Sequence, residues 1–175
     1  MRTIVTAALF LAPLAIARAQ STIPADVLRD WERSRKNVLA YVDAMPASAT
    51  AFRPTPGVRT FAEQFDHIVT TNLEVAALTL KGLSKAPVLG DSSRYLHDKA
   101  ALRAYAAATY DYVVAAIKAA TPAQVERQSP LYGQPPQPAS RWLALSLEHS
   151  VWTLGQVIPY LRLNKVTPPS YDIPF

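Results

Sequence analysis

Cysteine is absent from all 175 residues, so no disulfide can stabilise this chain and no thiolate can bind a metal in it. The same absence excludes a thiol nucleophile and a lipid attached to cysteine. Only five glycines are present, and they form neither a phosphate-binding loop nor a Gly-x-Ser-x-Gly elbow. The common motifs of hydrolases, thiol enzymes and nucleotide-binding proteins are therefore missing, and the fold must be stable through packing alone.

The N-terminal segment has the pattern of an export signal. Arg2 precedes an apolar run over residues 4–16, and Ala17-Arg18-Ala19 fits the small-x-small pattern of signal peptidase sites. The run is shorter than the roughly 20 residues that span a bilayer, and Pro13 interrupts it, which disfavours a membrane anchor. We expect residues 1–19 to be a signal peptide and residues 20–175 to be a periplasmic or secreted domain with no stable membrane anchor.

The composition of the remaining chain indicates one helical domain. The formal charge of +5 falls to +3 without Arg2 and Arg18, and the basic residues are scattered among acids rather than gathered with aromatics. No nucleic-acid partner is expected. Half of the residues are hydrophobic, and alanine is common while glycine is rare, as is typical of a helical domain with a core.

Four segments of helix length are predicted, with no evident strand pattern between them. Each has its own start and stop signals, such as the Thr60-Phe-Ala-Glu63 capping box and the prolines that follow the first and last segments. The sequence therefore predicts an all-α four-helix bundle with a long proline-rich crossover before the last helix. The predicted helices run from about Pro24 to Met45, from Thr60 to before Gly82, from an N-cap at Asp98 to Ala120, and from an N-cap at Ser140 to before Pro168.

The connections and the last helix carry further expectations. Residues 82–94 read as a loop, and four prolines between residues 121 and 137 predict an extended crossover. The last helix is apolar nearly all round, which predicts burial in the middle of the bundle, and Pro159 should kink it. The tail from Ser170 has no helical pattern, and we expect it to lie over the bundle or to remain loose.

Histidines are the candidate functional residues, because the chain has three of them and no cysteine. His67 and His149 lie in apolar helices, where a buried imidazole needs a hydrogen-bond partner or a metal. Both would be explained if the two helix faces met. Thr153 follows His149 by four residues on the same helix face, where a second histidine would complete a His-x-x-x-His metal clamp. His97 is expected at the surface.

Other possible metal ligands near the two histidines have simpler structural roles. Glu63 lies one turn before His67 but belongs to the capping box, and Glu148 points about 100° away from His149. A neutral hydroxyl such as that of Thr153 is a poor metal ligand unless it is deprotonated. The residues alone leave open whether a shared polar pocket or a metal site forms.

Two segments of the chain resemble the DinB-like (DinB/YfiT) family of bacterial four-helix proteins. Thr60-Phe-Ala-Glu-Gln-Phe-Asp-His67-Ile is similar to the motif on the family's second helix. The segment Gly155-Gln-Val-Ile-Pro-Tyr-Leu-Arg-Leu-Asn-Lys-Val-Thr-Pro-Pro169 is similar to its last helix and exit, with Lys165 in place of the usual glycine. The resemblance covers most of residues 20–175 and implies a four-helix bundle.

The resemblance also implies a divalent metal site, for zinc or nickel, with one histidine on the second helix and a His-x-x-x-His pair on the fourth. His67 and His149 match two of these ligands, and Thr153 stands at the third. Known activities in the family include bacillithiol transferases and mycothiol-dependent maleylpyruvate isomerase, in which the metal activates a small thiol. Related bundles commonly form homodimers.

Two hypotheses about function follow. In the first, the chain is an exported DinB-like binding or structural module with a degenerate metal pocket that takes a small-molecule ligand. In the second, it is a metal-dependent enzyme of the hydrolase or thiol-transferase type that uses a His67/His149 site. The crossover segment Gln134-Pro-Pro-Gln-Pro138 is an additional candidate for partner binding, although such segments are more often linkers.

Overall fold

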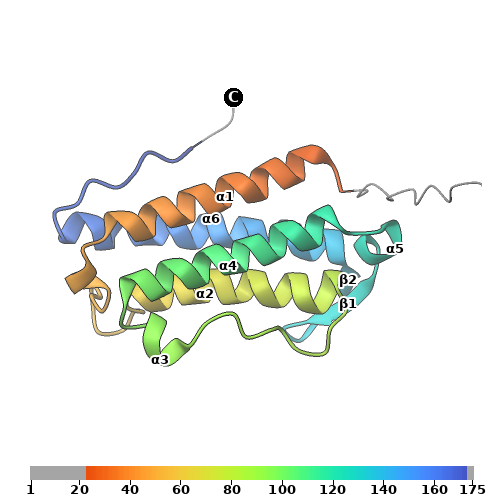
Figure 1. Ribbon diagram of the computed structural model, residues 1–175, viewed down its shortest axis with the longest axis horizontal. Helices are drawn as coiled ribbons and strands as arrows, with labels where there is room; N and C mark the ends of the chain where they lie inside the picture. The colour runs from red at the N-terminus through yellow and green to blue at the C-terminus, as the bar shows by residue number, and fades with distance from the viewer. Residues whose placement is uncertain (1–22, 173–175) are drawn as a thin grey trace, which may run out of the picture.

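The computed structural model describes residues 23–172, which form a bundle of long helices with a small two-stranded sheet at one end (Figure 1). The all-α bundle confirms the predicted fold class, and the proposed signal peptide lies outside the described residues. The long helices are α1 (Ala25–Ala44), α2 (Phe61–Glu74), α4 (Lys99–Lys118) and α6 (Ala139–Leu163).

The core forms where α4 packs against α1 and α2, and where α2 also packs against α6. Apolar side chains at helical spacing on each long helix face this interior and are excluded from solvent, which is the main source of stability in a chain without disulfides. The largest fully buried side chains are Trp31, Tyr110, Phe61, Phe65, Met45, Ile68, Leu80, Leu102, Ile117, Leu143, Leu161 and Val38.

Two predicted helix starts are confirmed in their hydrogen bonds. The Thr60 hydroxyl accepts from the Glu63 amide at 3.2 Å, and the Thr60 amide donates to the Glu63 carboxylate at 2.6 Å. The Asp98 carboxylate accepts from the Ala101 amide at the start of α4. These side chains satisfy amides that have no partner within the helix.

Short elements join the long helices. Helix α2 continues as a π-helical segment, η2 (Val75–Leu80), in which the Lys81 amide donates to the Ala76 carbonyl at 3.0 Å. The turn after η2 requires Gly82, because its φ is +68° and a Cβ at this position would clash with the Arg127 guanidinium. The remaining short helices are η1 (Ala47–Ala49), α3 (Ser92–Tyr95), which begins within the predicted 82–94 loop, and α5 (Pro122–Val125).

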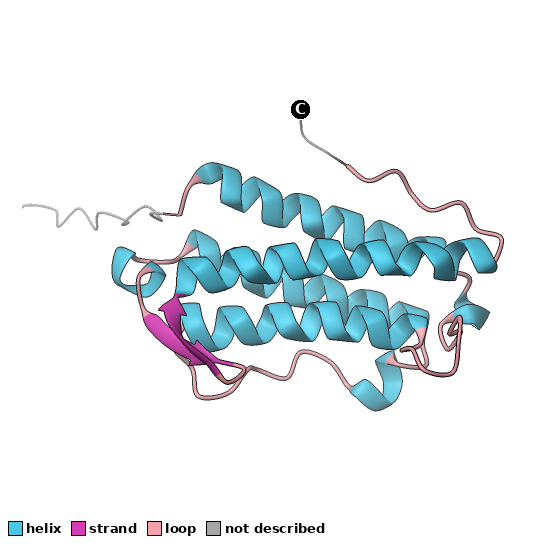
Figure 2. Ribbon diagram, turned by 180° about the vertical axis from the view of Figure 1, so that it is seen from behind, coloured by secondary structure: helices cyan, strands magenta, loops and turns pink. Residues whose placement is uncertain are grey.

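The crossover differs from the prediction, because it contains a β-hairpin at one end of the bundle (Figure 2). Antiparallel strands β1 (Gln128–Leu131) and β2 (Gln134–Pro138) join through Tyr132 and Gly133, whose φ values of 52° and 71° are those of a type I′ turn. The expectation of no strands was wrong because both strands are edges of the sheet. On an edge strand, a proline whose nitrogen faces solvent removes no hydrogen bond between the strands.

Helix α6 also departs from the prediction in two respects. It begins at Ala139, with Pro138 rather than Ser140 at the N-cap. Its continuation through Pro159 to Leu163 agrees with the predicted extent. One face of α6 is open to solvent: Trp152 is 70% exposed and Val151 41% exposed, so the expected burial all round was wrong. Within residues 23–172, no helix is long and apolar enough to cross a membrane.

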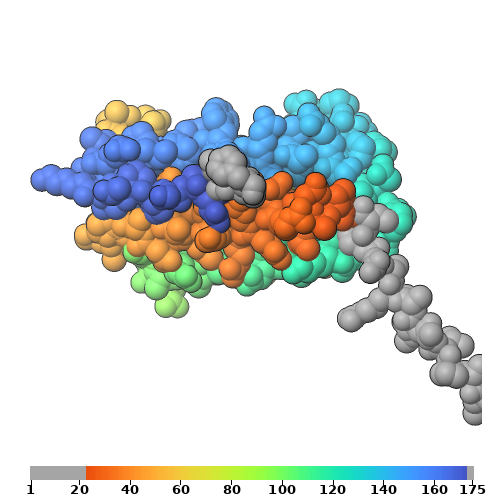
Figure 3. All heavy atoms as spheres, turned by 90° about the horizontal axis from the view of Figure 1, so that it is seen from above, coloured from red at the N-terminus to blue at the C-terminus, as the bar shows by residue number. Residues whose placement is uncertain are grey.

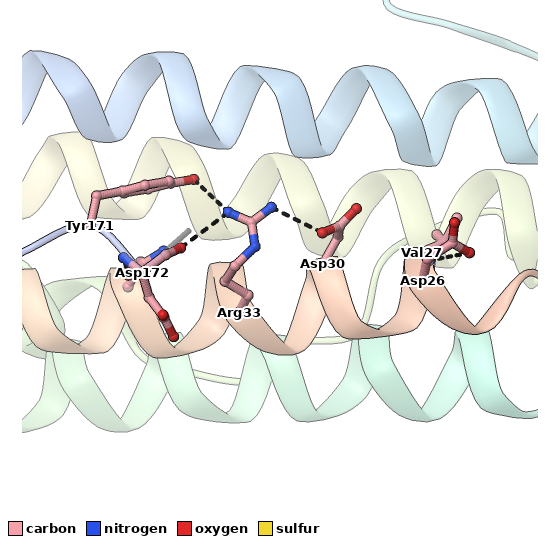
Figure 4. A network of polar contacts seen from close by, with 7 residues as sticks. Asp26, Val27, Asp30, Arg33, Tyr171 and Asp172 are labelled. Carbon is pink, nitrogen blue, oxygen red and sulfur yellow. Dashed lines mark hydrogen bonds and ion pairs between the residues drawn. The ribbon is translucent and has the colours of Figure 1, made fainter. Parts of the chain in front are cut away.

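The described part of the C-terminal tail lies beside α1 and α6, the first of the two predicted alternatives (Figure 3). Figure 4 shows the Arg33 guanidinium donating to the Tyr171 hydroxyl at 3.2 Å and to the Asp172 carbonyl at 3.4 Å. The Asp172 carboxylate accepts from Lys36 at 2.7 Å, and its amide donates to the Asn37 side chain. These contacts attach the tail to α1.

Candidate functional site

The two helical histidines meet between α2 and α6, as their sequence context predicts. The Nε2 atoms of His67 and His149 lie 3.0 Å apart, and the imidazole rings are nearly perpendicular, at 89°. The Thr153 hydroxyl lies 3.3 Å from the same Nε2 of His149. All three candidate site residues therefore converge on one point, which the α2–α6 packing places beside the bundle core.

The remaining ring nitrogen of His149 indicates which imidazole donates. His149 Nδ1 is buried and has no hydrogen-bond partner among the described residues. Among buried backbone groups, orphaned N–H donors are rarer than under-satisfied acceptors, which by analogy favours an unprotonated Nδ1. We infer that His149 carries its proton on Nε2 and donates it to Nε2 of His67.

Burial keeps both imidazoles neutral. The pKa of His67 is lowered first by burial, then by the charges of Arg59 and His149, while Asp66 acts in the opposite direction. The pKa of His149 is lowered by burial and by Arg59. Neutral imidazoles can form the hydrogen bond seen here and are also the form that binds metals.

The donor set only partly fits a zinc or nickel ion. Metal–nitrogen bonds of about 2.0–2.1 Å in a tetrahedral site give ligand separations of roughly 3.4 Å, close to the distances here. However, Thr153 offers a neutral hydroxyl, and metal on Nε2 of His149 would leave a buried N–H at Nδ1 without the usual acceptor. Within residues 23–172, no group of three or more His, Asp or Glu side chains forms a metal cluster.

The other candidates from the sequence do not complete the site. Glu63 is held in the capping box and lies 3.6 Å from the Arg53 guanidinium. Glu148 is exposed beside His149, and His97 is exposed at the start of α4, as expected. The Thr70 hydroxyl is engaged with Asp66 and with the hydroxyl of Tyr105 on α4.

Two adjoining cavities open beside the histidine pair. An apolar cavity of about 330 Å³ lies between α2, η2, α6 and the hairpin, with Val75, Trp142 and Leu145 in its walls. An open cavity of about 640 Å³ lies on the other side of His67, against the polar face of α2 and the residue 53–59 loop. His67, Thr71 and Tyr132 line both cavities, which therefore adjoin one another.

The hairpin supplies cavity residues that the sequence analysis did not find. Tyr132 stands at the hairpin turn, and its hydroxyl donates to the Glu74 carboxylate at 2.7 Å. The Trp142 indole nitrogen donates to the Ser129 carbonyl at 2.8 Å, which fixes β1 against α6. The one available signal was the Tyr132-Gly133 pair, because glycine favours the positive φ that such a turn requires.

A buried polar network adjoins the histidines on the core side. The side-chain oxygen of Asn72 accepts from Ser146 at 2.6 Å and from Ser150 at 3.0 Å, and its nitrogen donates to the Tyr110 hydroxyl. That hydroxyl also lies 2.8 Å from Ser34, so the network joins α1, α2, α4 and α6. Burial raises the pKa of Tyr110 to about 12, which keeps its hydroxyl neutral.

The sequence model of the DinB superfamily matches residues 30–157, which include both histidines, the cavities and most of the bundle. The chain belongs to the DinB superfamily. A DinB-like protein from Bacillus subtilis is similar in structure, with a TM-score of 0.69 and 18% identity over 84% of this chain and 98% of that chain. One from Bacillus cereus ATCC 10987 has a TM-score of 0.60 and 18% identity over 82% and 94% of the two chains.

These identities show a shared DinB fold and do not by themselves transfer a function. A comparison with curated proteins finds no match for the chain. Any function of this DinB domain must therefore be argued from its own residues at the histidine pair and the cavities beside it.

Proposed function

We propose that this chain is an exported DinB-like binding module that takes a small-molecule ligand at its histidine pocket and binds divalent zinc or nickel only weakly. The observation that carries the proposal is the Thr153 hydroxyl beside Nε2 of His149, where a third imidazole would complete the metal site. His67 and His149 would hold the metal, which when bound would act as a Lewis acid. The unpartnered Nδ1 of His149 further weakens the site.

A small-molecule ligand is supported by the apolar cavity. Its volume of about 330 Å³ lies within the usual range of ligand sites, and it combines apolar walls with the polar histidine pair at one end. The alternative of a metal-dependent enzyme has less support. It needs a group that can move a proton near the metal, and the nearby Glu63 carboxylate already accepts from Thr60 at 2.6 Å.

Export to the periplasm or medium is supported by the sequence of residues 1–19, and cleavage before Gln20 is the expected processing. The mass of the N-terminal peptide from protein secreted by a bacterial host tests this part of the proposal. A mature chain that begins at Gln20 supports export, and a chain that retains Met1 in the cytoplasm contradicts it.

Metal content tests the degenerate pocket. The chain from Gln20, purified without a histidine tag, should contain far less than one zinc or nickel per molecule by mass spectrometry after dialysis. Thr153→His should raise the content toward one per chain, because it supplies a third imidazole one turn from His149. His149→Ala, added to Thr153→His, is the matched control and should abolish the gain.

Metal near one per chain in the native protein, lost in His149→Ala, would contradict the weak-site proposal and favour the enzyme. If Thr153→His gains no metal although it folds normally by circular dichroism, the pocket does not have the ligand geometry argued here.

A further inference from the structure

The apolar and open cavities differ in the chemistry of their walls. The apolar cavity offers side chains such as Val75, Trp142 and Leu145, with little to satisfy a polar group except the histidines. The open cavity is lined by charged side chains from α2 and the residue 53–59 loop. Because the two meet at His67, Thr71 and Tyr132, one ligand can extend from an apolar environment into a charged one.

Arg59 is a charged residue of the open cavity, and its side chain has no hydrogen-bond or ion-pair partner among residues 23–172. The side chain is exposed. Arg53 in the same cavity differs, since its guanidinium lies 3.6 Å from Glu63. An arginine fork is well suited to bind a carboxylate through two parallel hydrogen bonds.

The acidic groups of the open cavity have hydrogen-bond partners other than Arg59, although the charge of Arg59 reaches Glu63, whose pKa is lowered first by the Thr60 amide and less by Arg53 and Arg59. Glu63 accepts from the Thr60 amide, and Glu74 accepts from the Tyr132 hydroxyl. One oxygen of Asp66 accepts from Tyr95 at 2.8 Å and from Thr70 at 3.0 Å.

The charge of Arg59 also acts at the junction of the cavities. After burial, Arg59 is the largest cause of the lowered pKa of His67, ahead of the opposing Asp66, and it also lowers the pKa of His149. The charge of Arg59 therefore reaches the junction of the two cavities, where it favours a negative group on a ligand.

We propose that the adjoining cavities bind a small monocarboxylate with an aromatic or aliphatic body, the body in the apolar cavity and the carboxylate at Arg59. The inference rests on the proposed function, whose small-molecule ligand it assigns to a chemical class. It requires no metal and no reaction. Tyr132, which lines both cavities, contacts the ligand where its apolar body ends.

Calorimetric titration of the chain from Gln20 with matched acids and alcohols tests the class of ligand. The probes are 3-phenylpropionate, 4-phenylbutyrate and 5-phenylpentanoate, each paired with the primary alcohol of the same length. We expect at least one acid to bind about tenfold more tightly than its alcohol, as a charge-assisted hydrogen bond provides. Arg59→Gln should remove the difference, whereas Arg141→Gln, an exposed arginine outside both cavities, should preserve it.

Leu145→Trp tests where the apolar body lies, because it fills the apolar cavity and should weaken the acid and the alcohol together. Equal binding of acid and alcohol, or an acid preference that survives Arg59→Gln, overturns the carboxylate inference but leaves the binding-module proposal intact. Unchanged binding in Leu145→Trp, or no binding by the whole series, also overturns the carboxylate inference. Metal content decides the degenerate pocket separately.

Discussion

Replacing Asn72 with leucine should destabilise the bundle more than any single exposed substitution, because Asn72 connects the buried polar network. The side chain is fully buried and takes part in three hydrogen bonds, with Ser146, Ser150 and Tyr110. Leucine has the same branching and the same number of side-chain heavy atoms, so the substitution leaves no cavity, and the expected effect comes mainly from lost polar contacts.

The three hydrogen-bond partners of Asn72 differ in the contacts that they keep after the substitution. Tyr110 keeps its contact with Ser34, and Ser150 keeps its bond to the Ser146 carbonyl at 2.9 Å. The Ser146 hydroxyl, 3% exposed, has no other bond among the described residues. One hydroxyl without a partner and two weakened contacts should lower the free energy of unfolding by about 2–4 kcal/mol. This corresponds to a fall in Tm of roughly 5–15 °C for a domain of this size.

Urea unfolding followed by circular dichroism at pH 7 measures this loss, and two double variants test its cause. Ser146→Ala in the Asn72→Leu background should recover about 1 kcal/mol, because it removes the orphaned hydroxyl. Ser150→Ala in the same background is the matched control and should recover little. Equal recovery by both serine variants, or none by either, would refute the assignment of the loss to Ser146.

Three further outcomes are expected from the structure. Folding lowers the pKa of His67 and His149 below the ordinary value of 6.5, so their contribution to stability is complete above pH 6.5 and is lost as the pH falls. Replacing both histidines with glutamine should therefore flatten the fall in Tm between pH 6.5 and 5. Gly155→Ala, at an open site within α6, should stabilise by about 0.5–1 kcal/mol in urea unfolding, whereas Gly82→Ala should destabilise because of its φ of +68° and the adjacent arginine. Tyr171→Ala removes a half-buried tail contact, a hydrogen bond and a cation–π contact with Arg33 and packing against the core, and should cost about 1–2 kcal/mol in the same assay, with a loss above about 3 kcal/mol contradicting the peripheral role of the tail.

The long helices could be predicted because their signals are local. The Thr60 capping box and the Asp98 N-cap depend on residues three positions apart, so the chain itself specifies where α2 and α4 begin. The start of α6 was misplaced at Ser140 because Pro138 supplies suitable backbone geometry without a side-chain cap. The hairpin was missed because its prolines obscure the pattern of a strand, and its position depends on the distant Trp142 contact.

The candidate site was predictable in part for the same reason. His67 and His149 are polar rings on apolar faces, so their meeting follows once the two helices pack together. Their joint environment does not follow from local sequence, since Tyr132 comes from the hairpin and Arg59 from the loop before α2. Tertiary packing alone brings these segments to one cavity.

The hydrogen bond between the two histidines bears directly on the proposal of weak metal binding. In a site built for metal, both Nε2 atoms are free of protons and each outer N–H has an acceptor. Here His149 has no acceptor at Nδ1, so the same burial that favours neutral imidazoles also favours a proton on Nε2, between the rings. A metal must displace that proton and leave a buried N–H unpaired, whereas a small ligand in the adjoining cavities need not disturb the pair. The hydroxyl of Thr153 and the missing acceptor at His149 thus both support the proposal of a pocket that binds small molecules more readily than metal ions.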